Sequence, residues 1–198
     1  MRIRPARPES AEGRKFAAYL DTAADGAFRA MLGSEMERIV AVAYVEKGHD
    51  LSFERAVFAE VDGRLVGMAS GYTSDEHRAS SDEPLRKAAG ARMVRMLLVM
   101  AVGRSMFRFI QTVPDGDFYL QDVAVDDDHR GKGIGALLID AMEERARQSG
   151  CRRFVLDVAE KNSGAQRLYE RRGMRVEAIS KRVLFLPNTR AQRMVKDL

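Results

Sequence analysis

The chain lacks tryptophan and has only one cysteine and three histidines in 198 residues. Because Cys151 stands alone, it excludes an internal disulfide and a cysteine-based metal cluster. His49, His77 and His129 are scattered along the sequence without the spacing of metal ligands. We therefore expect no metal, and we expect a cytoplasmic protein, since a chain without disulfides suits a reducing compartment.

Long apolar runs are also missing. The most hydrophobic stretch, residues 96–102, is far shorter than the about 20 apolar residues that a membrane-spanning helix needs. Residues 1–8 contain three arginines and no apolar segment of the kind found in signal peptides. We therefore expect no membrane partner.

The overall composition is that of an ordinary globular protein, with 45% hydrophobic and 31% charged residues. A chain of this length predicts a single domain over residues 1–198. The net charge of +4 and the pI of about 9.4 suit nucleic acid, a polyanionic cofactor or solubility alone. No dense Lys/Arg block with interleaved aromatics is present, so we expect no nucleic-acid partner.

Local patterns predict alternating strands and helices. Residues 2–6 and 118–125 have strand character, and residues 11–44 have helical periodicity that Asp25-Gly26 interrupts. Asp62-Gly63 lies between two apolar runs, which predicts a hairpin. A polar loop is expected over residues 74–84. Residues 175–186 are expected to contain one or two strands, with a turn at Pro187-Asn188, and the tail at 189–198 could form a final strand or fray.

A glycine-rich segment, DDDHRGKGIGA at residues 126–136, connects a β-branched run at 123–125 to a helical pattern. Backbone N–H groups at a helix N-terminus lack intrahelical partners, and the helix dipole is positive there. Glycines remove the side chains that would keep an anion away from these donors. The segment holds three glycines and two cations: Gly131, Gly133, Gly135, Arg130 and Lys132. This pattern predicts a site for phosphate or pyrophosphate.

The spacing of the glycines narrows the choice of ligand. The G-x-x-x-x-G-K-[ST] pattern of nucleoside-triphosphate loops is absent. The dinucleotide pattern G-x-G-x-x-G/A matches at Gly131, Gly133 and Ala136, and Asp157 could then be a ribose ligand. Polar residues 126–130 separate these glycines from the strand, and no strand–helix repeats precede them. A dinucleotide-binding oxidoreductase therefore remains an alternative only.

A second pattern, [QR]-x-x-G-x-[GA], fits Arg130, Gly133 and Gly135. Downstream, Asn162 and the segment AQRLYERRGM at 165–174 follow the order N-x-x-A-x-x-L-Y-E-x-x-G-F, with methionine in place of the final phenylalanine. Together these segments resemble the GNAT superfamily of N-acetyltransferases over about residues 118–176. The resemblance implies an α/β (α+β) fold with a mixed, mostly antiparallel sheet flanked by helices, and a helical insertion at about 73–117 between strands 3 and 4.

The resemblance also implies acetyl-CoA as co-substrate. The glycine loop would hold its pyrophosphate, and the backbone of the preceding strand would bind its pantetheine arm. The cofactor-binding residues would be Val123, Ala124, Val125, Arg130, Gly131, Lys132, Gly133, Ile134, Gly135, Ala136, Asn162 and Tyr169. Structural alternatives remain, since the valines could pack in the sheet and asparagine often caps a helix.

The resemblance makes Tyr169 the general acid, because a phenol is protonated at neutral pH and can donate to a leaving thiolate. The alternative is a half-buried core tyrosine. The general base is open between Asp157 and Asp122, with Gln121 beside the latter, and we place Asp157 slightly ahead. A bulge in the strand would shift its alternation, and water could serve as the base instead.

The expected function is direct transfer of an acetyl group from acetyl-CoA to a primary amine, on a small molecule or a protein. A non-catalytic CoA-binding regulatory domain is the main alternative. The acceptor and the acyl chain length are left open by the sequence. Residues 93–110 include Met93, Met96, Met100 and Met106. We expect a buried helix here, although the segment could also form a lid over the acceptor or a homodimer surface.

Overall fold

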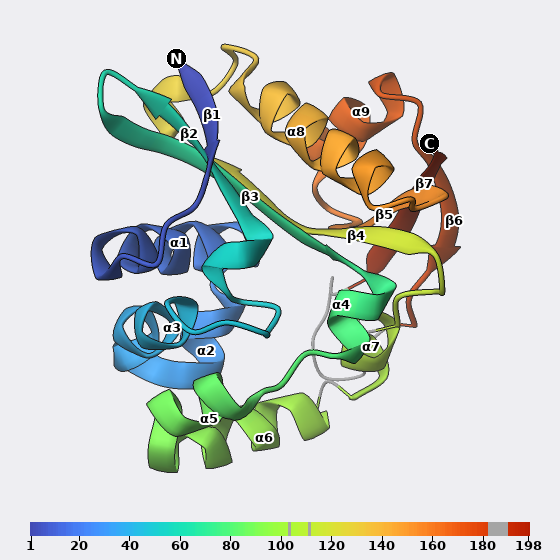
Figure 1. Cartoon of the computed structure of the whole chain (residues 1–198). Helices are drawn as coiled ribbons and strands as arrows, with labels where there is room; N and C mark the ends of the chain where they lie inside the picture. Colours follow the sequence, from blue (N-terminus) through green and yellow to red (C-terminus); the bar gives the residue numbers. More distant parts are fainter. Residues whose placement is uncertain (103, 111, 182–189) are drawn as a thin grey trace.

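The computed structural model describes residues 1–102, 104–110, 112–181 and 190–198 (Figure 1). Its centre is a seven-stranded sheet in the order β1-β2-β3-β4-β5-β7-β6. The strands are β1 Arg2–Pro5, β2 Ala56–Val61, β3 Arg64–Thr73, β4 Asp117–Val125, β5 Arg153–Ala159, β6 Arg175–Ile179 and β7 Ala191–Asp197. Among the strands of the described residues, only β4 and β5 pair in parallel. The predicted mixed, mostly antiparallel sheet is therefore confirmed.

The hairpin of β2 and β3 follows from its turn. Asp62 and Gly63 have φ values of 49° and 75°. Two successive positive φ angles are those of a type I′ turn, whose twist matches that of antiparallel strands. The hairpin predicted from Asp62-Gly63 is thus confirmed.

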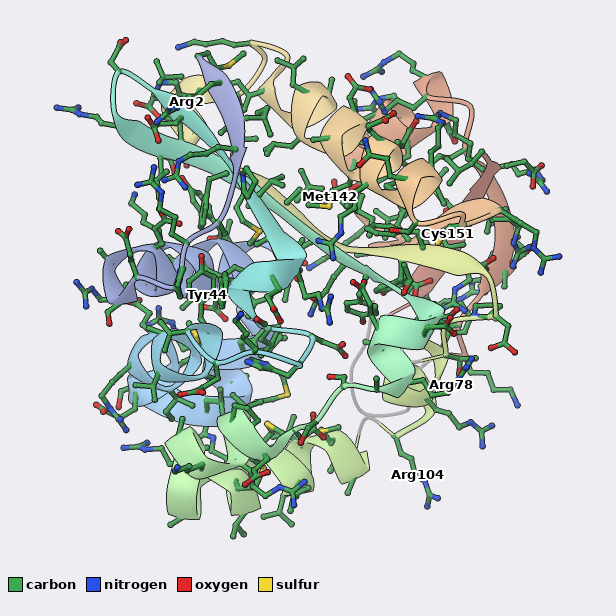
Figure 2. The ribbon with its side chains drawn as sticks, in the orientation of Figure 1. Arg2, Tyr44, Arg78, Arg104, Met142 and Cys151 are labelled. Atoms are coloured by element: carbon green, nitrogen blue, oxygen red, sulfur yellow. The ribbon has the colours of Figure 1, made fainter. Side chains whose placement is uncertain are left out.

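Helices from the N-terminal third cover one face of the sheet. They are α1 Ser10–Ala23, α2 Ala27–Leu32 and α3 Met36–Tyr44. The predicted break lies at Asp25 and Gly26, where φ is 52° and 79°. A second break at Gly33, with φ of 75°, was not predicted. Fully buried Phe16 and Tyr44 pack with ring centroids 5.0 Å apart and hold α1 against α3 (Figure 2).

The opposite face carries α8 Ile134–Gln148, with α9 Ser163–Arg171 beside it (Figure 1). The buried residues of α8 recur at helical spacing: Ile134, Leu138, Ile139, Met142 and Ala146. They meet Phe118 of β4 and Phe154 of β5, whose rings stack 5.7 Å apart. This packing fixes the N-terminus of α8 over the ends of the central strands.

The insertion between β3 and β4 is helical, as predicted. It contains α4 Ser74–Arg78, α5 Glu83–Ala89, α6 Met93–Val102 and α7 Arg104–Ile110. The polar loop expected over 74–84 is partly wrong, because α4 begins in a capping box. Thr73 Oγ1 accepts from the Glu76 N–H at 3.1 Å, and Glu76 Oε2 accepts from the Thr73 N–H at 2.9 Å.

The expectation of a buried helix over 93–110 is also wrong for α6. One side of α6 packs on the N-terminal helices, but Leu97 and Leu98 on its outer side are 57% and 64% exposed. At the C-terminus, β6 and β7 confirm strands at 175–179 and 191–197. The predictions for residues 182–188, including the turn at Pro187-Asn188, lie outside the described residues. Among the described residues, no helix has the length and apolarity needed to cross a bilayer.

Candidate active site

The central strands β4 and β5 separate before they end. Asp117–Leu120 of β4 pairs with Arg153–Leu156 of β5, and the pairing stops there. Residues 122–125 of β4 pair with β3 on their other side. Their β5-facing backbone groups are therefore left without a strand partner, and an extended ligand can pair with them. Val123, Ala124 and Val125 lie along this open edge.

A bulge in β4 sits at the point of separation. Ser70 of β3 faces Asp122, whereas its neighbour Gly71 faces Leu120, so Gln121 is the extra residue. Gly71 suits this position because a Cβ there would lie 2.7 Å from the Tyr119 carbonyl oxygen. The bulge reverses the alternation of the strand, since Leu120 and Val123 both join the core beneath α8. Asp122 therefore lies on the face that carries Tyr119.

The glycine loop lies where the sequence places it, at the N-terminus of α8. Gly133 is the N-cap residue, with φ of 81°, and no side chain caps the helix. The first backbone N–H groups of α8 therefore face outward without acceptors. A Cβ at Gly131 or Gly133 would meet no atom within 4 Å, so the space in front of the loop is open. This geometry fits the pyrophosphate of coenzyme A.

Tyr19 of α1 fixes the start of this loop and was not found by sequence reasoning. Its hydroxyl donates to Asp126 Oδ1 at 2.8 Å, and it lies 3.2 Å from the Leu65 carbonyl oxygen. Burial and the Asp126 carboxylate raise the pKa of Tyr19 well above its ordinary value. A hollow next to the loop is lined by Tyr19, Thr22, Val125, Asp126, Asp127, Asp128 and Arg130.

The acidic run before the glycines forms a single 3-10 turn at Asp127–His129. One ligand atom each from Asp126, Asp128 and His129 lies within 4.8 Å of the others. His129 Nδ1 is 2.8 Å from Asp128 Oδ1, which lowers the pKa of Asp128. Arg130 pairs with Asp127 at 2.8 Å. Asp127 and Asp128 thus each have a basic partner, Arg130 and His129 respectively.

Asn162 lies just before α9, and Tyr169 lies within the helix. Asn162 is the N-cap, and its Oδ1 accepts from the Ala165 N–H at 3.1 Å. The structural alternative for Asn162 is therefore correct, while its amide N–H₂ remains available for a ligand. Tyr169 packs partly buried beside the α8 core. Its hydroxyl has no hydrogen-bond partner in the described part of the chain.

The negative charge of Asp122 on β4 acts on the phenol of Tyr169 on α9. Burial and the negative charge of Asp122 raise the pKa of Tyr169 to about 12. Burial raises the pKa of Asp122 to about 7. The Oδ2 atom of Asp122 is buried and has no hydrogen-bond partner among the described residues. The pair thus offers a protonated phenol and a carboxyl group that ionises near neutral pH.

Asp157 is held differently. Its two carboxylate oxygens accept from Arg193 Nε and Nη2 at 3.0 and 2.8 Å, and Tyr119 Oη donates to it at 3.1 Å. The side chains of Asp157 and Arg193 are 2% and 7% exposed. Burial raises the pKa of Asp157, and Arg193 acts in the opposite direction. Both oxygens are therefore engaged in a buried ion pair.

Arg193 also ties the insertion to the sheet. It donates to the carbonyl oxygens of Thr112 and Phe109 at 2.7 Å each, and its guanidinium lies 4.8 Å from the Phe109 ring centroid. Nothing in the sequence near Arg193 signals this role, because its partners lie 36 to 84 residues away.

Aromatic side chains continue this polar cluster on the same face. The rings of Tyr72 and Tyr119 stack 5.6 Å apart, and His77 stacks on Tyr72 at 5.0 Å. Burial raises the pKa of Tyr72 well above its ordinary value, and the carboxylates of Asp50, Asp122 and Asp157 add to this effect. Three acidic groups therefore act on one phenol. None of these tyrosines was singled out from the sequence.

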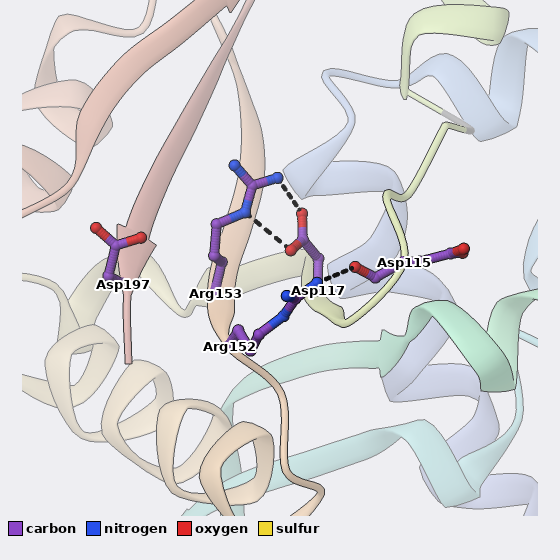
Figure 3. A pocket seen from close by; sticks show the side chains of 5 residues that line it. All are labelled: Asp115, Asp117, Arg152, Arg153 and Asp197. Atoms are coloured by element: carbon purple, nitrogen blue, oxygen red, sulfur yellow. Dashed lines mark hydrogen bonds and ion pairs between the residues drawn. The ribbon is translucent and has the colours of Figure 1, made fainter.

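A second hollow lies at the opposite ends of β4 and β5, where the two strands begin. Figure 3 shows Asp115, Asp117, Arg152, Arg153 and Asp197 around it. Arg153 donates to both oxygens of Asp117 at 2.9 and 2.6 Å. Because these charges neutralise each other and lie far along the strands from the glycine loop, the hollow is not part of the candidate site.

Cys151 lies just before β5 and borders the core beneath α8 (Figure 2). Burial raises the pKa of its thiol, which keeps it protonated. The expected packing role fits this position.

Parted central strands, a free backbone edge and a glycine loop at a helix N-terminus define an acyl-CoA acyltransferase fold. Comparison with solved structures agrees. A crystal structure of an acetyltransferase superposes with a TM-score of 0.70 at 23% identity, covering 100% of this chain and 99% of the other. An N-acetyltransferase from Staphylococcus aureus Mu50 gives a TM-score of 0.70 at 16% identity, covering 99% and 100%.

The chain belongs to the acetyltransferase (GNAT) family, which matches residues 27–174. Thialysine N-epsilon-acetyltransferase from Sus scrofa is 37% identical over 75 residues, which are 37% of this chain and 44% of that protein. The Mus musculus enzyme of the same name is 36% identical over 72 residues, 36% of this chain and 42% of that protein. The matched segment thus spans less than half of these relatives. The family resemblance drawn from the two motifs is confirmed.

Proposed function

We propose that this protein transfers an acetyl group from acetyl-CoA directly to a primary amine. The observation that carries the proposal is Asp122 at the point where β4 and β5 separate, with its negative charge acting on the Tyr169 phenol. Family membership and the open loop geometry support acetyl-CoA as the donor. The relatives named as N-acetyltransferases support an amine as the acceptor.

The bound thioester lies along the open edge of β4 in this proposal. The N–H groups at the start of α8 hold the pyrophosphate, with Arg130 and Lys132 as further positive charge. The backbone of Val123, Ala124 and Val125 pairs with the pantetheine arm. This arrangement brings the acetyl group to the bulge, next to Asp122.

Asp122 is the general base that we favour over Asp157. A general base works best when its pKa is near the operating pH, and burial raises the pKa of Asp122 to about 7. Its Oδ2 is also without a partner among the described residues. Asp157 would first have to release Arg193, which holds both of its oxygens. The amine nitrogen attacks the acetyl carbon and passes its proton to Asp122, while the carbon–sulfur bond breaks.

Tyr169 donates a hydrogen bond to the departing sulfur. A free thiol has a pKa of about 8.5, whereas the pKa of Tyr169 is raised to about 12. The phenol is therefore the weaker acid, and its hydrogen bond stabilises the developing thiolate during bond breaking. The proton that the thiolate finally takes up comes from protonated Asp122 or from water, which regenerates the base.

The acceptor is a cationic amine in this proposal. Asp50, Asp122 and Asp157 all act on the Tyr72 phenol, on the face that lies opposite α8. Because Arg193 compensates the charge of Asp157, the charges of Asp50 and ionised Asp122 attract an ammonium group. This group first releases one proton to solvent, and the neutral amine then attacks. Small polyamines, amino acids, aminoglycosides and protein lysines all satisfy this requirement.

A thiol-release assay with acetyl-CoA and a panel of primary amines tests the function. We expect turnover with at least one amine, and we expect Tyr169→Phe to lower kcat about 100-fold with little change in acetyl-CoA affinity. Tyr44→Phe is the matched control, since the Tyr44 hydroxyl is buried in the N-terminal core without a partner among the described residues. Acetyl-CoA binding without turnover by any amine would favour the regulatory-domain alternative, and binding of NADH instead would favour the oxidoreductase.

A further inference from the structure

The outer side of α6 is an apolar surface that the rest of the described chain leaves uncovered. Four large side chains point outward, with exposed fractions of 57% to 64%: Val94, Leu97, Leu98 and Val102. The inner side packs on the N-terminal helices through Met93, Met96, Val99 and Met100. A helix that is apolar all round is normally buried on all sides. Here one side meets solvent, which marks an interaction surface.

The chain segment that carries this surface is basic, although Glu83 begins α5 and Glu35 lies near Arg92. Residues 84–114 contain six basic residues and no acidic residue. All six are exposed: Arg86, Lys87, Arg92, Arg95, Arg104 and Arg108. Arg104 projects away from the body of the molecule beyond α6 (Figure 2). An apolar face rimmed by arginine and lysine is complementary to a surface that is both apolar and negatively charged.

The position of α6 at the edge of the molecule also favours a partner with a flat surface. α5 and α6 form the edge of the molecule farthest from the sheet, and no other element projects beyond them in Figure 1. Arg95 donates to the Ala30 carbonyl oxygen at 2.9 Å, which fastens α6 to α2. The outward-facing side of α6, with Val94, Leu97, Leu98 and Val102, is called the ridge below.

We propose that this ridge docks on an anionic lipid bilayer. Leu97, Leu98 and their neighbours would enter the boundary between headgroups and acyl chains, and the basic rim would bind the lipid phosphates. The absence of a long apolar run excludes a membrane-spanning helix only. It does not bear on a helix that lies in the plane of the membrane surface.

A second copy of the chain fits this ridge less well. Two copies would bring two basic rims together, which is repulsive. A stable dimer interface also buries about 800 Å² on each partner. A helix of ten residues is only about 15 Å long and about 10 Å wide, so its outer side is much smaller than such an interface.

Flotation of the full chain with lipid vesicles tests the proposal. We expect binding to vesicles of phosphatidylcholine mixed with phosphatidylglycerol, and little binding to pure phosphatidylcholine. Binding should weaken as salt rises from about 0.01 M to about 1 M, where the Debye length falls from about 30 Å to about 3 Å. Leu97→Glu/Leu98→Glu should lower the partition coefficient at least about tenfold.

The matched control is Val176→Glu/Ile179→Glu, since these β6 side chains are also 45% and 44% exposed. It should bind vesicles like the parent chain, and thermal unfolding checks that both double variants are folded. No binding to anionic vesicles, equal binding to neutral ones, or an equal loss in the β6 variant would overturn the proposal. A dimer in light scattering that Leu97→Glu/Leu98→Glu abolishes would instead identify a second copy as the occupant and would also overturn it.

Discussion

Replacing Asp122 with asparagine should stabilise the protein at neutral and alkaline pH while it removes activity. Burial raises the pKa of Asp122 from 3.8 to about 7. Between these two values the unfolded chain has lost the proton that the folded chain still holds. Folding stability therefore falls as the pH rises from about 4 to about 7, and the whole penalty is present above about pH 7. Asparagine stays neutral at every pH and carries no such penalty.

The size of this effect follows from the shift. About 3 pH units, at about 1.4 kcal/mol for each unit, give about 4 kcal/mol. Asp122 is partly exposed as a residue, although its Oδ2 is buried, so solvent screening reduces the figure to about 2 to 4 kcal/mol. For a domain of this length, that energy raises the midpoint of thermal unfolding by roughly 5–15 °C.

Thermal unfolding of both chains from pH 4 to pH 8 measures this difference in stability. Asp122→Asn should match the parent chain near pH 4 and exceed it increasingly up to pH 8. Glu46→Gln, at an exposed position after α3, controls for the loss of one negative charge and should show no such trend. A difference that stays constant with pH would refute the assignment of the raised pKa to Asp122.

The same variant links stability to catalysis. For the parent chain, kcat/KM should rise with pH through about 7 as Asp122 loses its proton. Asp122→Asn should lower kcat/KM by about 10² to 10⁴ and flatten this rise. An unchanged pH profile would mean that the raised pKa of Asp122 has no catalytic use, and Asp157 or water would then be the base.

Further predictions concern the loop and the ion pair. Gly133→Val forces valine to φ of 81° and should weaken acetyl-CoA binding roughly 10- to 100-fold in calorimetry. Gly150→Val is the control, because Gly150 also has a positive φ but follows the far end of α8. This control should leave the affinity for acetyl-CoA unchanged. Asp157→Asn leaves the buried Arg193 without its counter-charge and should destabilise the fold by about 3 kcal/mol in thermal unfolding, without moving the pH midpoint of the rate. A rate midpoint that shifts in Asp157→Asn would contradict the choice of Asp122.

The sequence predicted those parts of the site that depend on local backbone conformation. The glycine loop, the cap at Asn162 and the turn at Asp62-Gly63 each require particular φ angles or a capping side chain. Such requirements restrict the choice of residue directly. The mixed, mostly antiparallel sheet then followed from the family resemblance, and the structure confirms it.

Contacts between distant segments left no local pattern. The sequence left the base open between Asp157 and Asp122, with Asp157 slightly ahead, because tertiary geometry decides which carboxylate faces the thioester. Arg193 decides the matter in our proposal, and it lies 36 residues from Asp157. Similarly, the apolar composition of residues 93–110 favoured a buried helix, but the described fold packs α6 on one side only. Hydrophobic periodicity indicates what a helix can bury and does not show what lies next to it.

The bulge in β4 explains why alternation could not choose the base. In a regular strand, every second residue faces the same way, so Tyr119 would share its face with Gln121 and not with Asp122. The extra residue at Gln121 moves Asp122 onto the face of Tyr119, next to the open edge of the strand. Gly71 permits this local approach, because any side chain there would collide with Tyr119 and Phe118. Without the bulge, the amide of Gln121 would lie on the face of Tyr119. With the bulge, the carboxylate of Asp122 lies there instead, at the place where we propose that the amine is deprotonated.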